Sequence, residues 1–452
     1  MPFSPKIVLV GGGGVQWTHR LVRDLLMMPA LAEADIVLHD IDRAAAEALL
    51  PFFERLQPLL GTRARITATD DTAAAFAGAR YFIIAISTGG LDAMEHDIAI
   101  PERHGIRHTV GDTSGPGGWA RFFRNYPVFV ELARDINRHA PGAVVLNYTN
   151  PMTTLTDTLA RHCAGPVVGL CHALFESHEF IEQVFGREET RHLGCRYAGL
   201  NHFFWMTEVR APRRDLLAEL REMLRTRTLM DLVPRMPPDP AGFVSQRHVA
   251  DELFRRTGVF PYIGDRHTCE FFPDYITSPT AMERYQIART SIAERRRLLE
   301  VNRAALARMI REGIPNDFLK KSRESAADMI SAHWTGAPFI DVGNVPNVGQ
   351  IDNLPRGTVV ETDVRIDASG FTPLAFGALP PAVLAVVAPW AEVFNTMVHA
   401  AETRDAELAL RALRLDPVCA KMDDREVRQL GLALLAAHER WTSRIFHRRP
   451  TA

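Results

Sequence analysis

The chain of 452 residues is 46% hydrophobic and 23% charged, the composition of an ordinary globular protein that can bury a large core. Its formal net charge of −2 gives no indication of a nucleic-acid partner or an anionic membrane. Five cysteines without metal-knuckle spacing indicate free thiols in a reducing cytoplasm. The first apolar run is too short for a signal peptide and no stretch has eighteen apolar residues, so we expect a cytoplasmic protein that acts on a small molecule.

The first third of the chain alternates short apolar runs with helical patterns, which predicts parallel strands joined by helices. A first strand is predicted at Lys6–Val10, followed by four glycines and a helix that begins near Thr18. Further strands are predicted at 36–39, 81–86, 143–147 and 167–170. Each of them ends where a loop can carry functional residues.

The pattern changes after about residue 195. Residues 196–209 predict one strand, and charged helices follow, the longest over 288–310. Glycine, proline, asparagine and β-branched residues between 335 and 375 indicate short strands and turns. From about Ala382 the pattern is helical again.

These elements predict an α/β fold of two domains. Residues 1–195 would form a Rossmann-like, doubly wound parallel sheet that binds NAD. Residues 196–452 would form a mixed α/β domain for catalysis, substrate binding and oligomerisation. The combination is similar to lactate and malate dehydrogenases, and we expect the active site between the two domains.

The run Gly11–Gly14 lies between an apolar strand and a helix, where bare backbone can approach a pyrophosphate and the helix start supplies amide donors. The match to GxGxxG is imperfect, because the third glycine position holds Gln16 or Trp17, so a tight turn without a ligand stays the alternative. Asp40 ends the second strand and would bind ribose hydroxyls, with Asp42 as a second candidate; an acid there favours NAD over NADP. The predicted cofactor-binding residues are Gly11, Gly12, Gly13, Gly14, Val15, Gln16, Asp40 and Asn150.

Several motifs, taken in order along most of the chain, resemble glycoside hydrolase family 4, the NAD- and divalent-metal-dependent glycosidases. They are RHGIRHTVGDTSGPGGWARFFRNYP (103–127), NYTNP (147–151), GLCHA (169–173), GLNHFFW (199–205), GDRHTCEFFP (264–273) and NVPNVGQIDNLP (344–355). This family is an established exception to the two-carboxylate rule for glycosidases. The closest resemblance is to its α-galactosidase- and α-glucosidase-like members.

The resemblance implies a redox elimination. Bound NAD+ takes hydride from C3 of the sugar, a base removes the C2 proton that the new ketone has made acidic, and the C1 leaving group departs with acid assistance. Water then adds and the hydride returns. The expected substrates are α-galactosides, α-glucosides or α-uronides. The alternatives are an NAD-dependent dehydrogenase of a hydroxy acid or sugar without glycosidic cleavage, and a regulator that only senses NAD.

Carried over residue by residue, the resemblance makes Cys171 and His202 the metal ligands. Two protein ligands would leave positions for two sugar oxygens and a water, as an open catalytic site requires. Ligand softness alone would favour zinc, whereas the family is associated with Mn2+. From the residues alone, a buried free cysteine and a hydrogen-bonded histidine are the alternative. If the strand continued through Cys171 and His172, the two side chains would point to opposite faces.

The residues for proton transfer also follow from the resemblance. His172 replaces the Asp that follows the ligand cysteine in members acting on 6-phospho-sugars, so the acid of that subgroup cannot be transferred. Asp265 is the candidate base at C2, with Tyr275 as a fallback, and Asp112 is the candidate acid. A turn aspartate is the structural alternative for either one.

The remaining site residues are expected to contact the sugar. Arg266 could pair with a uronate carboxylate or with Asp265, and Glu270 resembles a glutamate of the α-galactosidase motif. The predicted substrate-binding residues are Asn150, His172, Asn201, Arg266 and His267. The resemblance also implies a homodimer or homotetramer.

Overall fold

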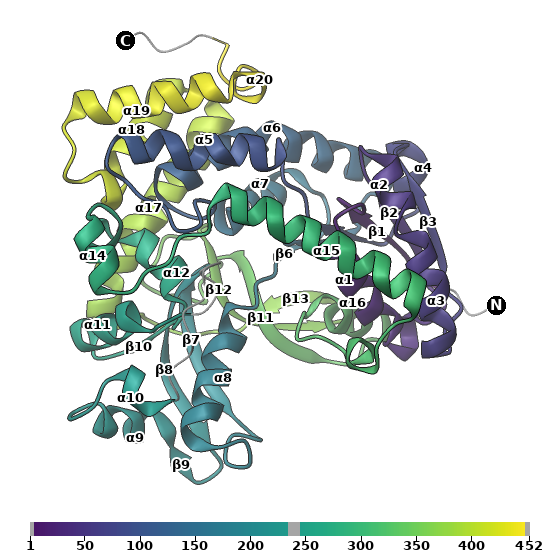
Figure 1. Ribbon diagram of the computed structural model, residues 1–452, viewed down its shortest axis with the longest axis horizontal. Helices are drawn as coiled ribbons and strands as arrows, with labels where there is room; N and C mark the ends of the chain where they lie inside the picture. The colour runs from purple at the N-terminus through teal and green to yellow at the C-terminus, as the bar shows by residue number, and fades with distance from the viewer. Residues whose placement is uncertain (1–3, 234–244, 448–452) are drawn as a thin grey trace.

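One sheet runs through the molecule, of which the computed structural model describes residues 4–233 and 245–447 (Figure 1). Its strands are β1 (Lys6–Val10), β2 (Asp35–His39), β3 (Arg65–Thr69), β4 (Tyr81–Ile84), β5 (Val144–Asn147), β6 (Val167–Gly169), β7 (Gly194–Leu200), β8 (Phe203–Ala211), β9 (Arg214–Asp215), β10 (Phe260–Pro261), β11 (Phe339–Pro346), β12 (Val359–Asp367) and β13 (Gly370–Pro373). The main path through the sheet is β10-β8-β7-β12-β11-β6-β5-β4-β1-β2-β3. Strands from both halves of the sequence therefore share one sheet.

Strands β1 to β6 are parallel and lie in the order 3-2-1-4-5-6, the arrangement of the doubly wound dinucleotide-binding fold. Alternate residues of β1 pack into two different hydrophobic clusters, with Ile7 and Leu9 in one and Val8 and Val10 in the other. Because both faces are covered, the central strands are apolar at nearly every position. The predicted N-terminal architecture is confirmed.

Helices α1 (Thr18–Leu26), α3 (Leu50–Leu60) and α16 (Ala326–Thr335) cover one face of the parallel strands, and α6 (Gly115–His139) and α7 (Met152–His162) cover the other (Figure 1). The remaining helices are α2 (Arg43–Glu47), α4 (Thr72–Phe76), α5 (Gly90–Arg103), α8 (Ala173–Phe185), α9 (Leu216–Met223), α10 (Leu229–Leu232), α11 (His248–Thr257), α12 (Asp265–Thr268), α13 (Pro273–Ile276), α14 (Pro279–Arg284), α15 (Ile292–Glu312), α17 (Pro381–Thr403), α18 (Ala406–Leu415), α19 (Asp424–Ala437) and α20 (Glu439–Thr442). Short 3-10 turns lie at η1 (Pro29–Leu31), η2 (Cys269–Phe271), η3 (Asn316–Leu319) and η4 (Pro417–Cys419).

The C-terminal half extends the sheet with antiparallel strands. One row of paired residues crosses the junction: Gly169 on β6 pairs with Asn344 on β11, Asn344 with Glu361 on β12, and Glu361 with Gly199 on β7. A Cβ on Gly169 would lie 2.6 Å from the Met152 sulfur, so this close approach requires glycine. The row brings the end of β6 and the end of β7 to the same region of the sheet.

One detail of the sequence interpretation is wrong, and the condition stated for Cys171 and His172 is not met. Residues 196–209 form two strands, β7 and β8, joined by a two-residue turn at Asn201 and His202, where His202 has a φ of 61°. Apolar residues continue on both sides of this turn, so the hydrophobic pattern alone does not reveal the reversal. Strand β6 ends at Gly169, and His172 is the N-cap of α8, so Cys171 and His172 belong to a loop and strand alternation does not orient them.

The expected mixture of strands and turns after residue 335 is present as β11 to β13, and helices follow from Pro381 as predicted. The proposed boundary between residues 195 and 196 stays a prediction, and in the structure it falls inside β7.

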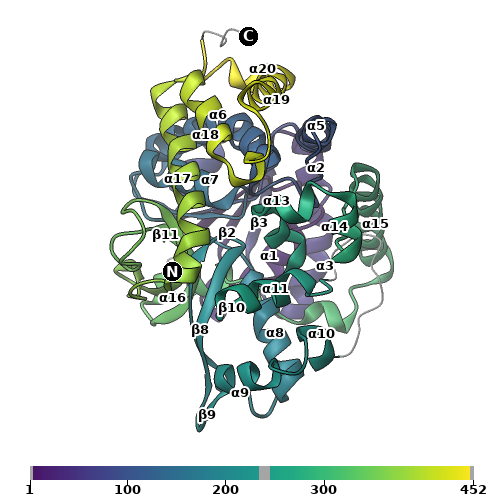
Figure 2. The same ribbon diagram turned by 90° about the vertical axis from the view of Figure 1, so that its left-hand side faces the viewer.

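Among the described residues, α17 is the one helix long and apolar enough to cross a membrane. Its apolar side chains, Val387, Trp390 and Phe394 among them, belong to the largest hydrophobic cluster of the protein. The helix packs against α18 and α7, as Figure 2 shows. Burial in the core therefore accounts for its composition.

Phe394 provides a test of this interpretation, because its side chain is only 3% exposed. We expect Phe394→Ala to lower the free energy of unfolding by about 3–5 kcal/mol through lost burial and a residual cavity. The exposed Glu392 on the same helix is the control, and Glu392→Ala should change stability by no more than about 0.5 kcal/mol. Thermal and urea unfolding of the soluble variants measures the difference. Equal stability of the two variants would contradict the assignment of α17 to the core.

Candidate active site

The glycine loop turns from β1 into α1 so tightly that side chains would not fit. Gly11 has a φ of 89°, and a Cβ on Gly12 would lie 2.7 Å from the Cα of Leu38. The amide of Gly13 donates to Asp40 Oδ2 at 2.8 Å, so the acid at the end of β2 borders the loop. Gly14, Val15 and Gln16 are exposed or half-exposed. Bare backbone next to a carboxylate and a helix start forms a cradle suited to a dinucleotide.

The structure separates the two candidate ribose acids by their contacts. The Asp42 side chain accepts from the amide of Ala45 at 3.1 Å and so caps α2. The Asp40 carboxylate lies against the glycine loop and also accepts from the amide of Asp42. Asp40 therefore has the position expected of the ribose ligand, and Asp42 has a structural task.

Asn150 lies just beyond the end of β5. Its carbonyl accepts from Arg121 Nε at 2.9 Å, while its side-chain Oδ1 is buried without a hydrogen-bond partner among the described residues. A buried amide oxygen that lacks a donor is costly unless a ligand supplies one. Asn150 therefore meets the requirement for a cofactor or sugar contact.

Cys171 and His202 lie together, although they are far apart in the sequence. Cys171 follows β6 and His202 occupies the β7–β8 turn, and the Sγ–Nε2 distance is 3.1 Å. The His202 ring also stacks on the ring of His267, with 3.9 Å between centroids. The structure thus brings both predicted metal ligands and one predicted substrate-binding residue to one place.

A chain of hydrogen bonds orients the His202 imidazole. The Thr113 hydroxyl donates to Asp112 Oδ1 at 2.9 Å, and Thr113 Oγ1 lies 3.2 Å from His202 Nδ1. Because the hydroxyl hydrogen is given to Asp112, His202 Nδ1 is assigned as the donor to Thr113. Nε2 then carries its lone pair toward Cys171, as a metal ligand requires.

Burial decides the protonation of the pair. It raises the pKa of the Cys171 thiol well above its usual range and lowers the pKa of His202 to about 4. Both groups are therefore neutral at pH 7 on their own, and a divalent cation would favour the thiolate. The described residues contain no group of three or more His, Cys, Asp and Glu side chains placed to hold a metal. The donor set is thus one sulfur and one nitrogen, with room for other ligands.

Asn201 supports the turn from behind. Its Nδ2 donates to Glu361 Oε2 at 2.9 Å, and Asn344 Nδ2 donates to the same oxygen at 2.9 Å. Burial raises the pKa of Glu361 to about 7. Sequence reasoning missed Glu361, which no recognisable pattern surrounds. Asn344 could have been found, because it begins the NVPNVGQIDNLP motif.

The candidate base Asp265 is 4% exposed, and its carboxylate accepts from the amides of Val249 and Ala250 at the start of α11. Burial raises its pKa to about 7 despite these donors. Among the described residues, the hydrogen bonds of this carboxylate come from backbone amides and not from Cys171 or His202. The fallback base Tyr275 is buried against the rings of Phe272 and Tyr285.

A second aromatic group near His202 escaped the sequence interpretation. The Tyr262 ring stacks 6.2 Å from that of His202, and its hydroxyl donates to Glu176 at 2.6 Å. Glu176 and Glu324 both face His172, and they raise its pKa. Tyr262 lies three residues before Asp265, within an apolar run that reads as ordinary core.

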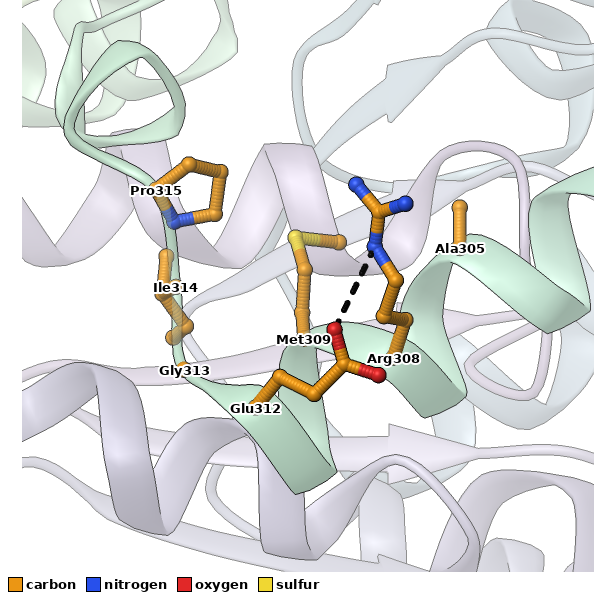
Figure 3. Close-up of a pocket in the computed structure, with 7 residues that line it drawn as sticks. All are labelled: Ala305, Arg308, Met309, Glu312, Gly313, Ile314 and Pro315. Atoms are coloured by element: carbon orange, nitrogen blue, oxygen red, sulfur yellow. Dashed lines mark ion pairs between the residues drawn. The ribbon is translucent and has the colours of Figure 1, made fainter.

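His172 borders a hollow of about 330 Å³ next to the glycine loop. Its lining is Trp17, Arg20, His172, Phe175, Glu176, Glu179, Arg323 and Glu324. A larger open hollow lies elsewhere, at the C-terminal end of α15, where Arg308 pairs with Glu312 at 3.9 Å (Figure 3). None of the predicted site residues line the hollow at α15, whereas His172 lines the smaller one. The smaller hollow is therefore the one that belongs to the site.

Arg266 and Glu270 tie the 108–112 loop to the region after β10. Glu270 is fully buried and accepts from the Thr109 hydroxyl and from the amides of Val110 and Gly111. Burial alone would raise its pKa, but His108 and these donors outweigh burial and lower it to about 2. The Asp112 and Glu270 charges act most strongly on the Arg266 guanidinium, whereas Asp265 is held by amides.

Sequence models of one family match both parts of the chain. The model described as "Family 4 glycosyl hydrolase" matches residues 6–187, and the one described as "Family 4 glycosyl hydrolase C-terminal domain" matches residues 197–419. An α-galacturonidase of Bacillus subtilis is 33% identical and covers 94% of this chain and 95% of its own length. An α-galactosidase of Rhizobium meliloti is 30% identical, covering 98% of this chain and 90% of its own.

Solved structures agree with the fold. A candidate glucosidase of Bacillus subtilis has a TM-score of 0.85 at 31% identity, covering 96% of this chain and 100% of its own. A 6-phospho-β-glucosidase of Thermotoga maritima, solved with manganese, NAD+ and glucose-6-phosphate, has a TM-score of 0.77 at 21% identity, covering 96% and 99%. A malate dehydrogenase of Cryptosporidium parvum reaches 0.52 at 12% identity, covering 89% and 100%. The last two show the fold alone.

The Glu270 anchor yields a test of pH dependence. Because its pKa is lowered on folding, its stabilising contribution is complete above the ordinary value of 4.5 and is lost as the pH falls toward about 2. We expect Glu270→Gln to cost about 3 kcal/mol at pH 7 and to flatten the loss of stability between pH 5 and 3. Thermal midpoints across this range measure the effect. The exposed Glu300 is the control, and a profile of Glu270→Gln parallel to those of the wild type and Glu300→Gln would refute the role of Glu270.

Proposed function

The chain belongs to family 4 of the glycosyl hydrolases, and we propose that it hydrolyses α-galactosides, α-glucosides or α-uronides with NAD and a divalent cation, Mn2+ being the expected ion. The observation that carries the proposal is the contact of Cys171 Sγ with His202 Nε2. In the same sheet, the glycine loop after β1 and Asp40 at the end of β2 form the cradle suited to a dinucleotide. The relatives named above act on α-galacturonides and α-galactosides.

The residues fit NAD. A Cβ on Gly12 would collide with Leu38, so the loop can lie against β2 only as bare backbone. Asp40 faces the loop from the end of β2, and the buried Oδ1 of Asn150 lacks a donor that a carboxamide or sugar hydroxyl could supply. Manganese, NAD+ and glucose-6-phosphate are all present in the Thermotoga maritima structure. We expect the same cofactor pair here.

The residues also fit a divalent cation. Cys171 and His202 would hold it, with Nε2 of His202 unprotonated because Nδ1 is assigned as the donor to Thr113. Two protein donors leave positions for sugar oxygens. When bound, NAD supplies reversible hydride exchange with the sugar and the cation supplies positive charge beside the sugar hydroxyls.

The protein groups have separate tasks in such a reaction. Asp112 is half-exposed and hydrogen-bonded to Thr113, so we assign it to proton transfer at the leaving group. Asp265, with its pKa near 7, stays the proposed base at C2, a task for which its carboxylate would have to exchange an amide donor for the substrate. His172, Asn201, Arg266 and His267 are proposed to contact the sugar or to position the groups that do.

A cytoplasmic location and assembly into a homodimer or homotetramer belong to the same proposal. All five cysteines are free, as a reducing compartment requires. The competing function is a dehydrogenase that shares the fold but leaves glycosidic bonds intact. It differs in one respect that is easy to measure, because a dehydrogenase consumes NAD with each turnover whereas the glycosidase regenerates it.

The mechanism predicts exchange at C2 of the sugar. We expect hydrolysis of 4-nitrophenyl α-galactoside or α-galacturonide, run in heavy water with NAD+ and Mn2+, to give a product that carries deuterium at C2 without net formation of NADH. Proton NMR of the product and absorbance at the NADH band measure the two quantities. Hydrolysis without deuterium uptake would exclude the elimination, and stoichiometric NADH formation would favour the dehydrogenase.

The metal site predicts a selective loss in Cys171→Ser. Because the thiolate is one of two protein donors, we expect Mn2+ affinity to fall by at least about tenfold, while NAD binding changes little. Electron paramagnetic resonance of Mn2+ and calorimetric titration with NAD+ separate the two effects. The matched control is Cys195→Ser on β7, whose sulfur is half-buried and away from His202. Unchanged Mn2+ binding in Cys171→Ser would remove this cysteine from the metal site.

A further inference from the structure

Three arginines from different helices surround Asp112. Arg121 lies on α6, Arg266 on α12 and Arg295 on α15, and the Asp112 carboxylate is a leading charge partner of all three. Burial lowers the pKa of each guanidinium, that of Arg295 to about 10, because charge is costly away from water. The Glu270 charge also acts on Arg266 and Arg295, so three guanidinium groups face two carboxylates and positive charge is in excess at this point.

Two of these arginines have donors to spare. Arg121 is 7% exposed; its Nε donates to the Asn150 carbonyl and its Nη2 to the Ser87 hydroxyl, while its Nη1 is buried without a partner. Arg295 Nη2 donates to the Val110 carbonyl at 3.2 Å, and its Nε is buried without a partner. Among the described residues, the hydrogen-bond acceptors of both arginines are therefore neutral oxygens.

Two other arginines nearby donate to acids. Arg124, on the same helix as Arg121, donates to both oxygens of Asp97, and Arg296, next to Arg295, pairs with Asp92 at 2.8 Å. Glu270 is not a hydrogen-bond partner of either arginine, because its oxygens accept from a hydroxyl and two amides. Arg121 and Arg295 differ from these two arginines because no carboxylate accepts a hydrogen bond from either among the described residues, and an unfilled buried donor is costly unless a ligand occupies it.

The two arginines contact the chain next to predicted site residues. Val110, which binds Arg295, is two residues from Asp112, and the intervening chain leads to Thr113 and its contact with His202. Arg121 donates to the carbonyl of Asn150, and the side-chain Oδ1 of Asn150 is buried without a hydrogen-bond partner among the described residues. Arg295 is thus linked to the metal-ligand pair through residues 110–113, and Arg121 to the expected cofactor or sugar contact through Asn150.

We propose that Arg295 and Arg121 bind the carboxylate of a uronic acid unit, which makes the enzyme selective for α-uronides. The inference rests on the proposed glycosidase function and names its substrate class. A planar carboxylate with two oxygens matches guanidinium donors and neutralises the excess charge around Asp112. A neutral galactoside or glucoside carries a hydroxymethyl group at the same carbon and would leave both arginines unpaired.

Paired substrates test the selectivity. We expect wild-type enzyme, loaded with NAD+ and Mn2+, to have a higher kcat/KM for 4-nitrophenyl α-galacturonide than for 4-nitrophenyl α-galactoside. Arg295→Gln and Arg121→Gln should each reduce this ratio at least ~30-fold, as loss of a buried charge partner does, and Arg295→Lys should restore part of it. Arg296→Gln is the matched control, since its guanidinium is exposed and already paired, and its ratio should equal that of the wild type.

Binding of free sugars provides a readout that does not depend on turnover. Calorimetric titration of the NAD+- and Mn2+-loaded protein with D-galacturonate, D-galactose and D-galactose 6-phosphate should show the tightest binding for galacturonate, and Arg295→Gln should abolish that advantage. Tighter binding of the phosphosugar, an equal substrate ratio in the wild type, or an unchanged ratio in both glutamine variants would overturn the carboxylate site and leave the glycosidase function intact. Failure to cleave either glycoside, with arginine-dependent galacturonate binding retained, would overturn the function and support the site.

Discussion

The candidate site depends on one row of paired residues across the sheet. Gly169, Asn344, Glu361 and Gly199 pair in turn across β6, β11, β12 and β7, and this register brings together two strand ends that are far apart in the sequence. Cys171 follows Gly169 by two residues, and His202 follows Gly199 by three. A shift of register at any of these strands would separate the thiol from the imidazole. The row also explains why Glu361, in its middle, accepts from Asn201 and Asn344.

The protonation state of the two ligands follows from this position. Away from water, the Cys171 thiol keeps its proton and the His202 imidazole is unprotonated. Neither side chain therefore carries a charge of its own. The hydrogen bonds that link His202 Nδ1 to Thr113 and Thr113 to Asp112 already orient the imidazole ring without a cation. The protein therefore presets the direction of the nitrogen lone pair. If Cys171 and His202 hold the proposed cation, deprotonation of the sulfur would accompany its binding, and the affinity would depend on pH.

The sequence predicts the local parts of this arrangement better than the distant ones. The parallel strands, the glycine cradle and Asp40 follow from a short pattern within one βαβ unit, and the structure has them where the pattern puts them. The turn at His202 was read as strand, because apolar residues continue on both sides of it. Tyr262 and Arg295 reach the site through tertiary packing and not through a motif of their own, so no local periodicity marks them. The metal-ligand pair was identified from family resemblance, since a lone cysteine and a lone histidine carry little information.

Two buried glutamates show how partners, and not burial alone, set charge around the site. Glu361 and Glu270 are both fully buried, yet the pKa of one rises to about 7 and that of the other falls to about 2. Glu361 accepts from two side-chain amides and keeps one oxygen without a partner, whereas Glu270 accepts from a hydroxyl and two backbone amides beside His108. Glu361, which supports the turn of His202, can thus take up a proton near neutral pH. Glu270, which anchors the loop that carries Asp112, stays negatively charged. The charge of Glu270 is thus held by fixed hydrogen-bond donors. The guanidinium groups around Asp112 stay available to a bound sugar.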